Sequence, residues 1–401
     1  MMTTDETIAL EQALEIPTYS KMPMALVRGE GRHVYDASGT AYLDFYGGHC
    51  VCLLGHCPPH VVAAVQKQAA ELMFYSNVAH SPVRAAAAQA LVSLAPDALS
   101  QVFFANSGSE ANETALKLAR TYTGRSEVVA LSGGFHGRTL GALSTTHKEA
   151  YRAPYLDVLP ETYFAPHGDL HALESLLASE DVAAVILEAI QSIAGMRMAS
   201  TDYMQGVREL CSAYGTMLIL DEVQTGVGRT GTFSISEHYG ITPDLITLAK
   251  SLGAGVPVSA VLVHDDIAAT VQPGDQGSTF GGGMLAMAAV KATLDQVVED
   301  DLMARASDIH SLLTAYVGDM VDEVRGKGCL IGLKLDVPVA PVLKALRAPS
   351  QPTPVLVGGS ADPHVMRLMP PLTTTDAEIE TFANALESAL ASLAADTLET
   401  A

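Results

Sequence analysis

Asp221 and Lys250 are the residues of this chain whose types and positions first suggest chemistry. Asp221 follows the apolar residues 217–220, and Lys250 follows the largely apolar residues 245–248 after one alanine. Apolar runs of this length, bounded by Gly and polar residues, are typical of strands that are buried on both faces. Because open α/β sheets bind their ligands at the ends of such strands, we expect the carboxylate and the amine to lie in one site.

A lysine and an aspartate placed in this way could support carbonyl chemistry. A buried lysine loses solvation, so its amine is more easily deprotonated and becomes a nucleophile towards carbonyl groups. Enzymes that use pyridoxal phosphate (PLP) need such a lysine, together with an acid that keeps the pyridine nitrogen protonated. An isolated pair of these residues would more often form an ion pair at the strand ends, so the interpretation depends on the rest of the chain.

A first Gly/Ser loop has the pattern of a phosphate site. The apolar residues 102–105 predict a strand, which leads through Ser107, Gly108 and Ser109 into a predicted helix. Ser107 and Glu110 have the spacing of a capping box. A helix that begins in a small Gly/Ser loop leaves backbone N–H groups free at the positive end of its dipole, and this arrangement can bind phosphate.

Two further glycine-rich loops carry side chains of interest. Ser278 and Thr279 lie among glycines ahead of another predicted helix, so this loop is a second candidate for a phosphate contact. Phe135, His136 and Arg138 follow two glycines after a predicted strand. An aromatic ring can stack on a cofactor, and an arginine can hold a carboxylate with two parallel hydrogen bonds. Alone, such a phenylalanine would more often belong to the core and such an arginine to the solvated surface.

Composition and charge restrict the class of protein. The chain has 401 residues, of which 48% are hydrophobic, so we expect one large domain with a smaller partner. No stretch resembles a transmembrane helix and the acidic start does not resemble a signal peptide, so a cytoplasmic enzyme is expected. The net charge of −22, from 23 basic and 45 acidic residues, argues against nucleic acid or an anionic membrane as a partner.

One segment superficially resembles a metal site. Cysteines and histidines are interleaved along residues 49–60: His49, Cys50, Cys52, His56, Cys57 and His60. There is no CxxC pair, and no second ligand cluster follows at zinc-finger spacing, so buried or loop-lining residues are favoured and no metal is expected. The odd count of five cysteines also argues against a disulfide framework.

A GxGxxG match provides an alternative from a different class of enzyme. Gly226, Gly228 and Gly231 could indicate an NAD-dependent Rossmann oxidoreductase. Five residues separate the predicted strand from these glycines, and no second strand ending in an acid follows about twenty residues later, as the fingerprint requires. The context therefore disfavours this alternative.

Five blocks of sequence together resemble a known family. They read NSGSEANETALKLAR, FHGRTLGALSTT, LILDEVQTGVGRTG, TLAKSLGAGVP and GSTFGG. In this order they resemble the signature blocks of the class III aminotransferases, which are PLP enzymes of fold type I. The resemblance runs from about Val27 to the last predicted helix. Within the family it is strongest to the acetylornithine aminotransferases of arginine biosynthesis, and DFYGGHCVCLLGHCPPH, FYSN and VMRLMPPL are similar to a subgroup that can use N2-succinylornithine.

The resemblance implies roles for individual residues. Lys250 would bind the cofactor covalently and then carry the proton between the substrate carbon and the cofactor, and Asp221 would pair with the pyridinium nitrogen. Thr279 would reach the cofactor phosphate from the neighbouring subunit of a homodimer. The full set of implied cofactor residues is Ser107, Gly108, Ser109, Phe135, Asp221, Val223, Gln224, Lys250 and Thr279.

The resemblance also implies four substrate-binding residues: Arg138, Ser278, Glu188 and Arg367. Arg138 would bind the α-carboxylate, and Arg367 lies in an apolar run, which suggests that it is paired or functional. Many relatives carry a glutamate at the position of Ile193, which pairs with the matching arginine and masks it for one half-reaction. Its absence here would leave Arg367 free for a substrate carboxylate or acyl oxygen, which favours an acylated donor.

We therefore predict an α/β fold with a mostly parallel seven-stranded sheet flanked by helices, and a small α+β domain. The expected boundaries are 1–50 and 284–401 for the small domain and 51–283 for the large, PLP-binding domain. The expected reaction is transamination of N2-acetyl-L-ornithine with 2-oxoglutarate. Alternatives are N2-succinylornithine, ornithine or 4-aminobutyrate as donor, an aminomutase, and a PLP-binding protein without catalysis.

Overall fold

A seven-stranded sheet forms the centre of the computed structural model, which describes residues 2–178 and 181–400, the last five by their backbone only. The strand order is β4-β12-β11-β10-β7-β5-β6. β11, β10, β7, β5 and β6 pair in parallel, whereas β12 is antiparallel to both β11 and β4. The strands are β4 (Gln101–Ala105), β5 (Glu127–Leu131), β6 (Thr162–Ala165), β7 (Val182–Leu187), β10 (Met217–Asp221), β11 (Leu245–Leu248) and β12 (Ser259–Val263). The predicted mostly parallel seven-stranded sheet is confirmed.

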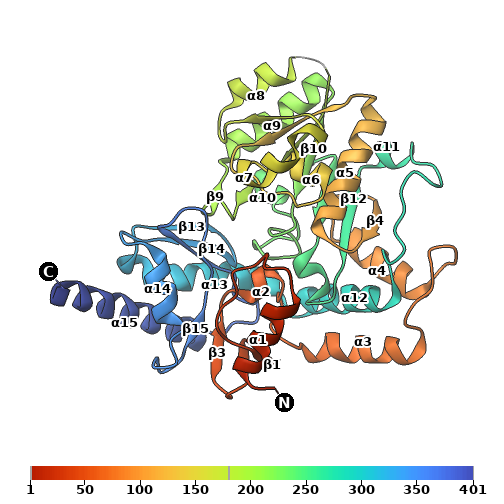
Figure 1. Ribbon diagram of the computed structural model, residues 1–401. Coiled ribbons are helices and arrows are strands. Elements are labelled where there is room, and N and C mark those ends of the chain that lie inside the picture. The colour runs from red at the N-terminus through yellow and green to blue at the C-terminus, as the bar shows by residue number, and fades with distance from the viewer. Residues whose placement is uncertain (1, 179–180, 401) are drawn as a thin grey trace.

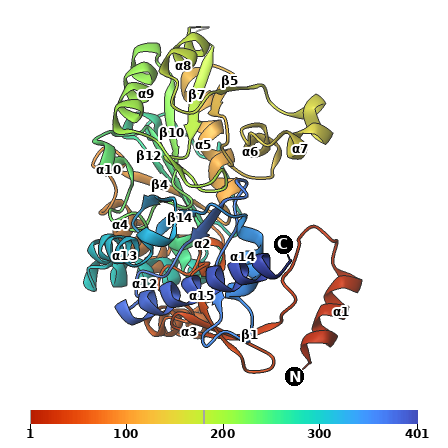
Figure 2. The ribbon, with the colours of Figure 1, turned by 90° about the vertical axis from the view of Figure 1, so that its left-hand side faces the viewer.

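Helices cover both faces of this sheet because its strands are apolar on both sides. β7, β11 and β12 are buried along their whole length. On one face, residues of α5 (Gly108–Thr123) pack against alternate strand residues such as Ala184 and Ile219. The other face contributes Val185 and Leu218 to a core shared with α8 (Leu170–Leu177) and α9 (Thr201–Tyr214). α9 and α5 accordingly lie on opposite sides of β7 and β10 (Figure 2).

Two smaller sheets are built from residues near the two ends of the chain. A four-stranded sheet has the order β1-β2-β3-β15, and β15 pairs in parallel with β3, so a C-terminal strand completes an N-terminal meander. A three-stranded antiparallel sheet has the order β13-β14-β16. The boundaries expected at residues 50 and 283 stay a prediction. The strands are β1 (Leu26–Glu30), β2 (His33–Asp36), β3 (Ala41–Asp44), β13 (Glu323–Lys327), β14 (Leu330–Lys334), β15 (Val355–Leu356) and β16 (Val365–Leu368), with β8 (Ile190–Gln191) and β9 (Arg197–Met198) as a separate pair.

The longer helices outside the large sheet pack on one another. α12 runs beside α3 and α4 (Figure 1), and α13 packs against α15. These helices are α3 (Pro59–Glu71), α4 (Pro82–Val92), α12 (Met284–Glu299), α13 (Leu302–Val317), α14 (Val339–Leu346) and α15 (Asp376–Thr400). Short helices are α2 (Gly47–Cys50), α6 (Leu140–Ser144), α7 (Glu149–Arg152), α10 (Ser236–Tyr239), α11 (Asp265–Ala268), η1 (Ala153–Val158), η2 (Lys250–Gly253) and η3 (Gly318–Met320). None of the described helices is long and apolar enough to cross a membrane.

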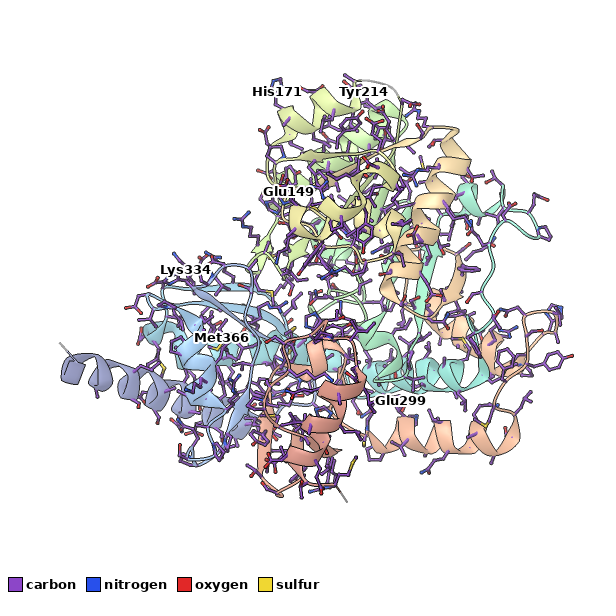
Figure 3. The ribbon with its side chains drawn as sticks, in the orientation of Figure 1. Glu149, His171, Tyr214, Glu299, Lys334 and Met366 are labelled. Atoms are coloured by element: carbon purple, nitrogen blue, oxygen red, sulfur yellow. The ribbon has the colours of Figure 1, made fainter. Side chains whose placement is uncertain are left out.

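Side chains separate into core and surface as their types suggest (Figure 3). Met366 of β16 is fully buried, whereas Glu149 of α7, His171 of α8 and Glu299 of α12 are exposed. The first helix, α1 (Thr4–Leu14), has no buried residue and stands apart from the rest of the chain (Figure 2). The large sheet and the helices around it therefore form the framework on which the candidate site is built.

Candidate active site

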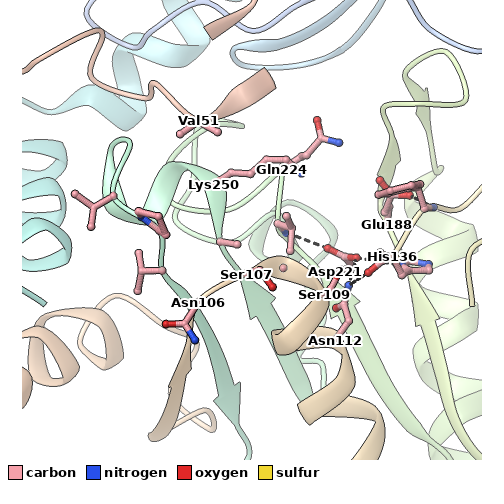
Figure 4. A pocket seen from close by; sticks show the side chains of 18 of the residues that line it. Val51, Asn106, Ser107, Ser109, Asn112, His136, Glu188, Asp221, Gln224 and Lys250 are labelled. Atoms are coloured by element: carbon pink, nitrogen blue, oxygen red, sulfur yellow. Dashed lines mark hydrogen bonds and ion pairs between the residues drawn. The ribbon is translucent and has the colours of Figure 1, made fainter. Parts of the chain in front are cut away.

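A cavity of about 380 Å³ opens at the ends of β10 and β11, where the sequence predicted a site (Figure 4). Asp221 at the end of β10 and Lys250 just after β11 both line it. The other predicted residues that line the cavity are Ser107, Gly108, Ser109, Phe135, Glu188, Val223 and Gln224. Arg138, Ser278, Thr279 and Arg367 are not among its lining residues.

Asp221 is buried and held by hydrogen bonds from three directions. His136 Nδ1 lies 2.7 Å from its Oδ2 atom, and Asn112 Nδ2 donates to the same oxygen at 2.8 Å. The backbone N–H of Val223 donates to Oδ1 at 3.1 Å. A buried carboxylate requires such partners, and these fix its orientation at the cavity wall.

Asn112 and His136 are the supporting residues that the sequence did not identify by role. Asn112 also donates to the carbonyl oxygen of His136 at 2.7 Å and accepts from Thr247 Oγ1 at 2.7 Å. The side chains of Asn112, His136 and Thr247 are all buried. A polar residue on the mostly apolar buried face of α5 was the available signal for Asn112.

Lys250 has both an unusual backbone and an unusual environment. Its φ of +36° lies in the left-handed region, which costs a residue with a side chain about 1 kcal/mol or more. Burial lowers the pKa of the Lys250 ammonium group, while Cys50, Asp221 and Glu188 act in the opposite direction. A depressed pKa makes the neutral, nucleophilic amine more accessible, as the predicted covalent role requires.

Glu188 follows β7 and is the second buried carboxyl group of the cavity. Its Oε1 atom accepts a hydrogen bond from the Phe135 N–H at 2.8 Å. Burial raises the pKa of Glu188 to about 7, and the charge of Asp221 adds to this, whereas His136 and the Phe135 N–H oppose it. This group therefore changes protonation near neutral pH, unlike an ordinary glutamate.

The N-terminus of α5 also lines the cavity, through residues 107–109. Ser107 caps the helix, because its Oγ atom accepts from the Glu110 N–H at 3.3 Å. The predicted capping box is only half correct, since the Glu110 carboxylate accepts from the N–H and side chain of Asn106 instead of the Ser107 N–H. A Cβ atom on Gly108 would lie 3.0 Å from Val223 Cγ1, so glycine allows this turn to approach the cavity wall.

The residues present fit PLP. The first N–H groups of α5 can receive the phosphate, and Asp221 offers a carboxylate to the ring nitrogen. Phe135 and Val223 provide apolar contacts for the ring, and both line the cavity. Gln224 also lines it, and its Oε1 atom is buried without a hydrogen-bond partner among the described residues, so it can accept a bond from a ligand.

Three of the predicted residues lie beside the cavity. The Arg138 side chain is exposed, and its guanidinium group stacks 3.4 Å from the centre of the Tyr151 ring and 5.9 Å from that of Phe135. Ser278 Oγ accepts from Asn106 Nδ2 at 3.2 Å, which links its loop to the start of α5. Thr279 is exposed on the same loop.

Arg367 is buried in β16 and held by neutral oxygen atoms. Its Nη1 atom donates to Ser192 Oγ at 3.1 Å, and its Nε atom donates to the Gly359 carbonyl at 2.5 Å. No carboxylate lies within ion-pair distance of it among the described residues. Burial lowers the pKa of Arg367, with Tyr46 acting against this. The contact with Ser192, next to Ile193, was not predicted.

The GxGxxG segment does not have the context of a dinucleotide site. The loop after β10 makes successive turns, and the next helix is the four-residue α10. Arg229, within this loop, is fully buried and donates to the carbonyl groups of Pro370 and Cys329 at 2.5 and 3.4 Å. A Cβ atom on Gly231 would lie 2.6 Å from Ser307 Oγ, so this glycine serves close packing.

Comparison with known proteins identifies the family. The model of the family described as "Aminotransferase class-III" matches residues 16–390. The acetylornithine aminotransferase of Methanosarcina acetivorans is 40% identical over 390 residues, which covers 96% of each chain. That of Bacillus subtilis is 38% identical and covers 93% of this chain and 97% of its own.

Solved structures agree with this assignment. The ornithine aminotransferase of Toxoplasma gondii superposes with a TM-score of 0.91 at 28% identity, covering 99% of this chain and 97% of its own. The acetylornithine aminotransferase of Elizabethkingia anophelis gives a TM-score of 0.84 at 29% identity, covering 97% and 99%. The Rossmann alternative is therefore wrong. The chain belongs to the class III aminotransferases, the PLP-dependent transaminases of fold type I.

Proposed function

We propose that this enzyme transfers the terminal amino group of N2-acetyl-L-ornithine to 2-oxoglutarate, giving N2-acetyl-L-glutamate 5-semialdehyde and L-glutamate in arginine biosynthesis. The observation that carries the chemistry is the cavity in which Lys250, with its lowered pKa, and the buried Asp221 both lie. The choice of donor is supported by relatives named acetylornithine aminotransferase that are 38–44% identical.

The protein's own residues would divide the work in the cavity. Bound PLP supplies an electron sink for the carbanion formed at the substrate carbon. Lys250 would hold the cofactor through its amine and, once released, would move the proton at that carbon. Asp221 would place a negative charge at the ring nitrogen, and His136 and Asn112 keep its carboxylate in position.

The remaining cofactor contacts follow from the lining of the cavity. Ser107, Gly108 and Ser109 would hold the phosphate at the start of α5. Phe135 would stack on the ring, with Val223 and Gln224 against its other surfaces. The support for these roles is that all six residues line one cavity with Lys250.

Substrate binding would use charges at the edge of the cavity. Arg138 would bind a carboxylate of the substrate, and its position beside the Phe135 ring supports this role. Arg367 would receive a second carboxylate or an acyl oxygen, because its buried charge lacks an acidic partner among the described residues. Ser278 and Glu188 would complete the set close to the reacting groups.

A homodimer in which Thr279 reaches the partner's cofactor phosphate is part of the proposal. Supporting it, large apolar side chains are exposed around the Thr279 loop, where water would otherwise contact them. Phe74 and Phe280, whose ring centres are 5.2 Å apart, belong to this group. Its members are Met73, Phe74, Tyr75, Val78 and Phe280, which are between 39% and 86% exposed.

We also propose a cytoplasmic location for the enzyme. All five cysteines are free thiols, as is usual in a reducing compartment, which supports this location.

The visible spectrum of the holoenzyme tests this function. Titration with N2-acetylornithine should bleach the band of the lysine-bound cofactor, and 2-oxoglutarate should restore it. Parallel titrations with N2-succinylornithine, ornithine and 4-aminobutyrate measure the preference for the donor. Bleaching by ornithine or 4-aminobutyrate alone would overturn the substrate, and a band that persists in Lys250→Ala would overturn the assignment of the lysine.

A further inference from the structure

Cys52, His56 and Asp44 form a continuous hydrogen-bonded line outside the cofactor cavity. His56 Nε2 lies 2.7 Å from Asp44 Oδ2, and its other ring nitrogen, Nδ1, lies 3.6 Å from Cys52 Sγ. The thiol and the imidazole belong to the Cys/His-rich segment 49–60, and the carboxylate belongs to β3. The order thiol, imidazole, carboxylate is that of an activated nucleophile with its base and the group that orients the base.

Asp44 is held so that only one of its oxygens faces His56. The carboxylate is buried, and its Oδ1 atom accepts hydrogen bonds from the backbone N–H groups of Tyr46 and Gly47, both at 2.9 Å. Oδ2 is left for the imidazole. A buried carboxylate beside a histidine ring fixes its orientation and favours its charged form.

His56 is confined by the hairpin between β1 and β2. Its backbone N–H donates to the Gly31 carbonyl at 2.6 Å, and a Cβ atom on Gly29 would lie 2.7 Å from the His56 Cβ. The hairpin residues in these two contacts are glycines, and the titratable groups that interact with the ring among the described residues are Asp44 and Cys52. Burial lowers the pKa of His56, but the hydrogen bonds with Asp44 and Cys52 raise it to about 10.

We propose that Cys52 is a reactive nucleophile, activated by the adjacent His56 ring that Asp44 orients, and that it is a modification site for small disulfides and soft electrophiles. The sulfur would attack one sulfur of a low-molecular-weight disulfide. A new S–S bond forms to Cys52, the original S–S bond breaks, and the released thiolate takes a proton from solvent. A thiol reductant reverses the exchange. Cys52 is half-buried, so a small reagent has access to it.

An adduct on Cys52 would affect the cofactor site through the adjacent backbone. Val51, its immediate neighbour, lines the cavity. The carbonyl oxygen of Cys50 accepts a hydrogen bond from Ser251 Oγ at 3.2 Å, and Ser251 follows Lys250 in the chain. A displacement of residue 52 would therefore shift both Val51 in the cavity wall and the turn that carries Lys250.

The test measures the alkylation of each cysteine of the holoenzyme by iodoacetamide between pH 6 and 8, using peptide mass spectrometry. Cys57 serves as the internal reference, because it is exposed in the same segment and lies outside this line. An ordinary thiol below its pKa of about 8.5 gains roughly tenfold in rate per pH unit. Cys52 should change less than about threefold over this range and react at least tenfold faster than Cys57 at pH 6.

Variants separate activation by the histidine from exposure alone. His56→Phe and Asp44→Asn should each lower the Cys52 rate at pH 6 by about tenfold or more and restore a normal pH dependence. Cys57→Ser should leave the Cys52 profile unchanged. Oxidised glutathione should then give a mixed disulfide at Cys52 that dithiothreitol removes. A Cys52 rate in the unaltered enzyme that rises in parallel with that of Cys57, or no labelling of Cys52 at any pH, would overturn the proposal.

Discussion

The molecule contains two Asp–His pairs with the same 2.7 Å separation, one between Asp221 and His136 and the other between Asp44 and His56. In the first pair both residues line the cofactor cavity, and the completely buried histidine contacts the carboxylate through Nδ1. In the second pair the carboxylate stands behind, and the histidine, 16% exposed, faces a thiol. The same contact therefore supports opposite functions, depending on which partner faces the reacting group.

The two histidines differ in what their second ring nitrogen contacts, that is, the nitrogen that does not face the aspartate. His136 Nε2 is buried and has no hydrogen-bond partner among the described residues, so the contact of this ring nitrogen pair with another side chain is the one between Nδ1 and Asp221. His56 uses both nitrogens, one towards Asp44 and one towards Cys52. An Asp–His pair taken alone therefore does not define a function. The function depends on the group that contacts the pair, which is the cofactor cavity for Asp221 and the Cys52 thiol for His56.

The largest effect is expected from Asp221→Asn, which keeps the shape of the side chain and removes its charge. We expect turnover to fall about 1,000-fold, because the charge that Asp221 would place at the ring nitrogen is lost in a buried site. Steady-state rates with N2-acetylornithine and 2-oxoglutarate measure this, with cofactor content determined after denaturation. A loss smaller than tenfold in a fully loaded variant would show that this carboxylate is not the group that matters.

Glu188 sharpens the comparison, because it is a buried carboxyl group without a histidine partner. Its folded-state pKa of about 7 lies above the unfolded value of 4.5, so the folded state binds more protons between these values. Its contribution to stability therefore falls as pH rises from 4.5 to 7. Relative to the unaltered protein, Glu188→Gln should gain up to about 3 kcal/mol in free energy of unfolding over this range. Urea titrations at several pH values measure this, and a pH-independent difference would contradict it.

Removing each histidine in turn tests whether the two pairs have separate functions. His136→Phe should lower turnover about tenfold, since Asp221 loses a hydrogen bond worth roughly 1.5–3 kcal/mol. It should leave the rate of Cys52 alkylation unchanged, whereas His56→Phe should lower that rate. Circular dichroism of both variants controls for folding. Equal effects of both changes on alkylation would show that the two pairs are not independent.

The smallest effect is expected at Ser192, which holds Arg367. Ser192→Ala removes one neutral hydrogen bond, worth about 1 kcal/mol, from the guanidinium group. If Arg367 binds a substrate as proposed, we expect the KM of that substrate to rise about fivefold with kcat little changed. Measuring both substrates separately identifies which one Arg367 binds. A drop in kcat with constant KM would place the serine in a different role.

Much of the cavity was predictable because its residues are local to strand ends and helix starts. Asp221 and Lys250 follow apolar runs whose burial requires a strand, and Ser107 to Ser109 begin a helix with a recognisable pattern. The half-correct capping box shows the limit of this approach. Glu110 has the expected spacing to Ser107, yet its carboxylate binds Asn106, and spacing alone does not distinguish these two partners.

The contacts that orient the predicted residues were not predictable, because they join distant segments. Asn112 and Asp221 are 109 residues apart, and Ser192 and Arg367 are 175 apart. Each contact depends on how a helix or loop packs across the ends of the sheet. A sequence pattern reports the burial of single elements, and it carries no information on which buried polar groups meet.

The sequence by itself determined the family, the sheet and the chemical types gathered at its edge, because these depend on local periodicity and on residues next to strand ends. Only the tertiary structure decided that His136 supports Asp221 and which cysteine and histidine of the interleaved segment meet. Cys52 meets His56 within one loop, but the carboxylate that orients the imidazole comes from β3. Hydrogen bonds act over about 3 Å, so their partners are fixed only once the chain is packed.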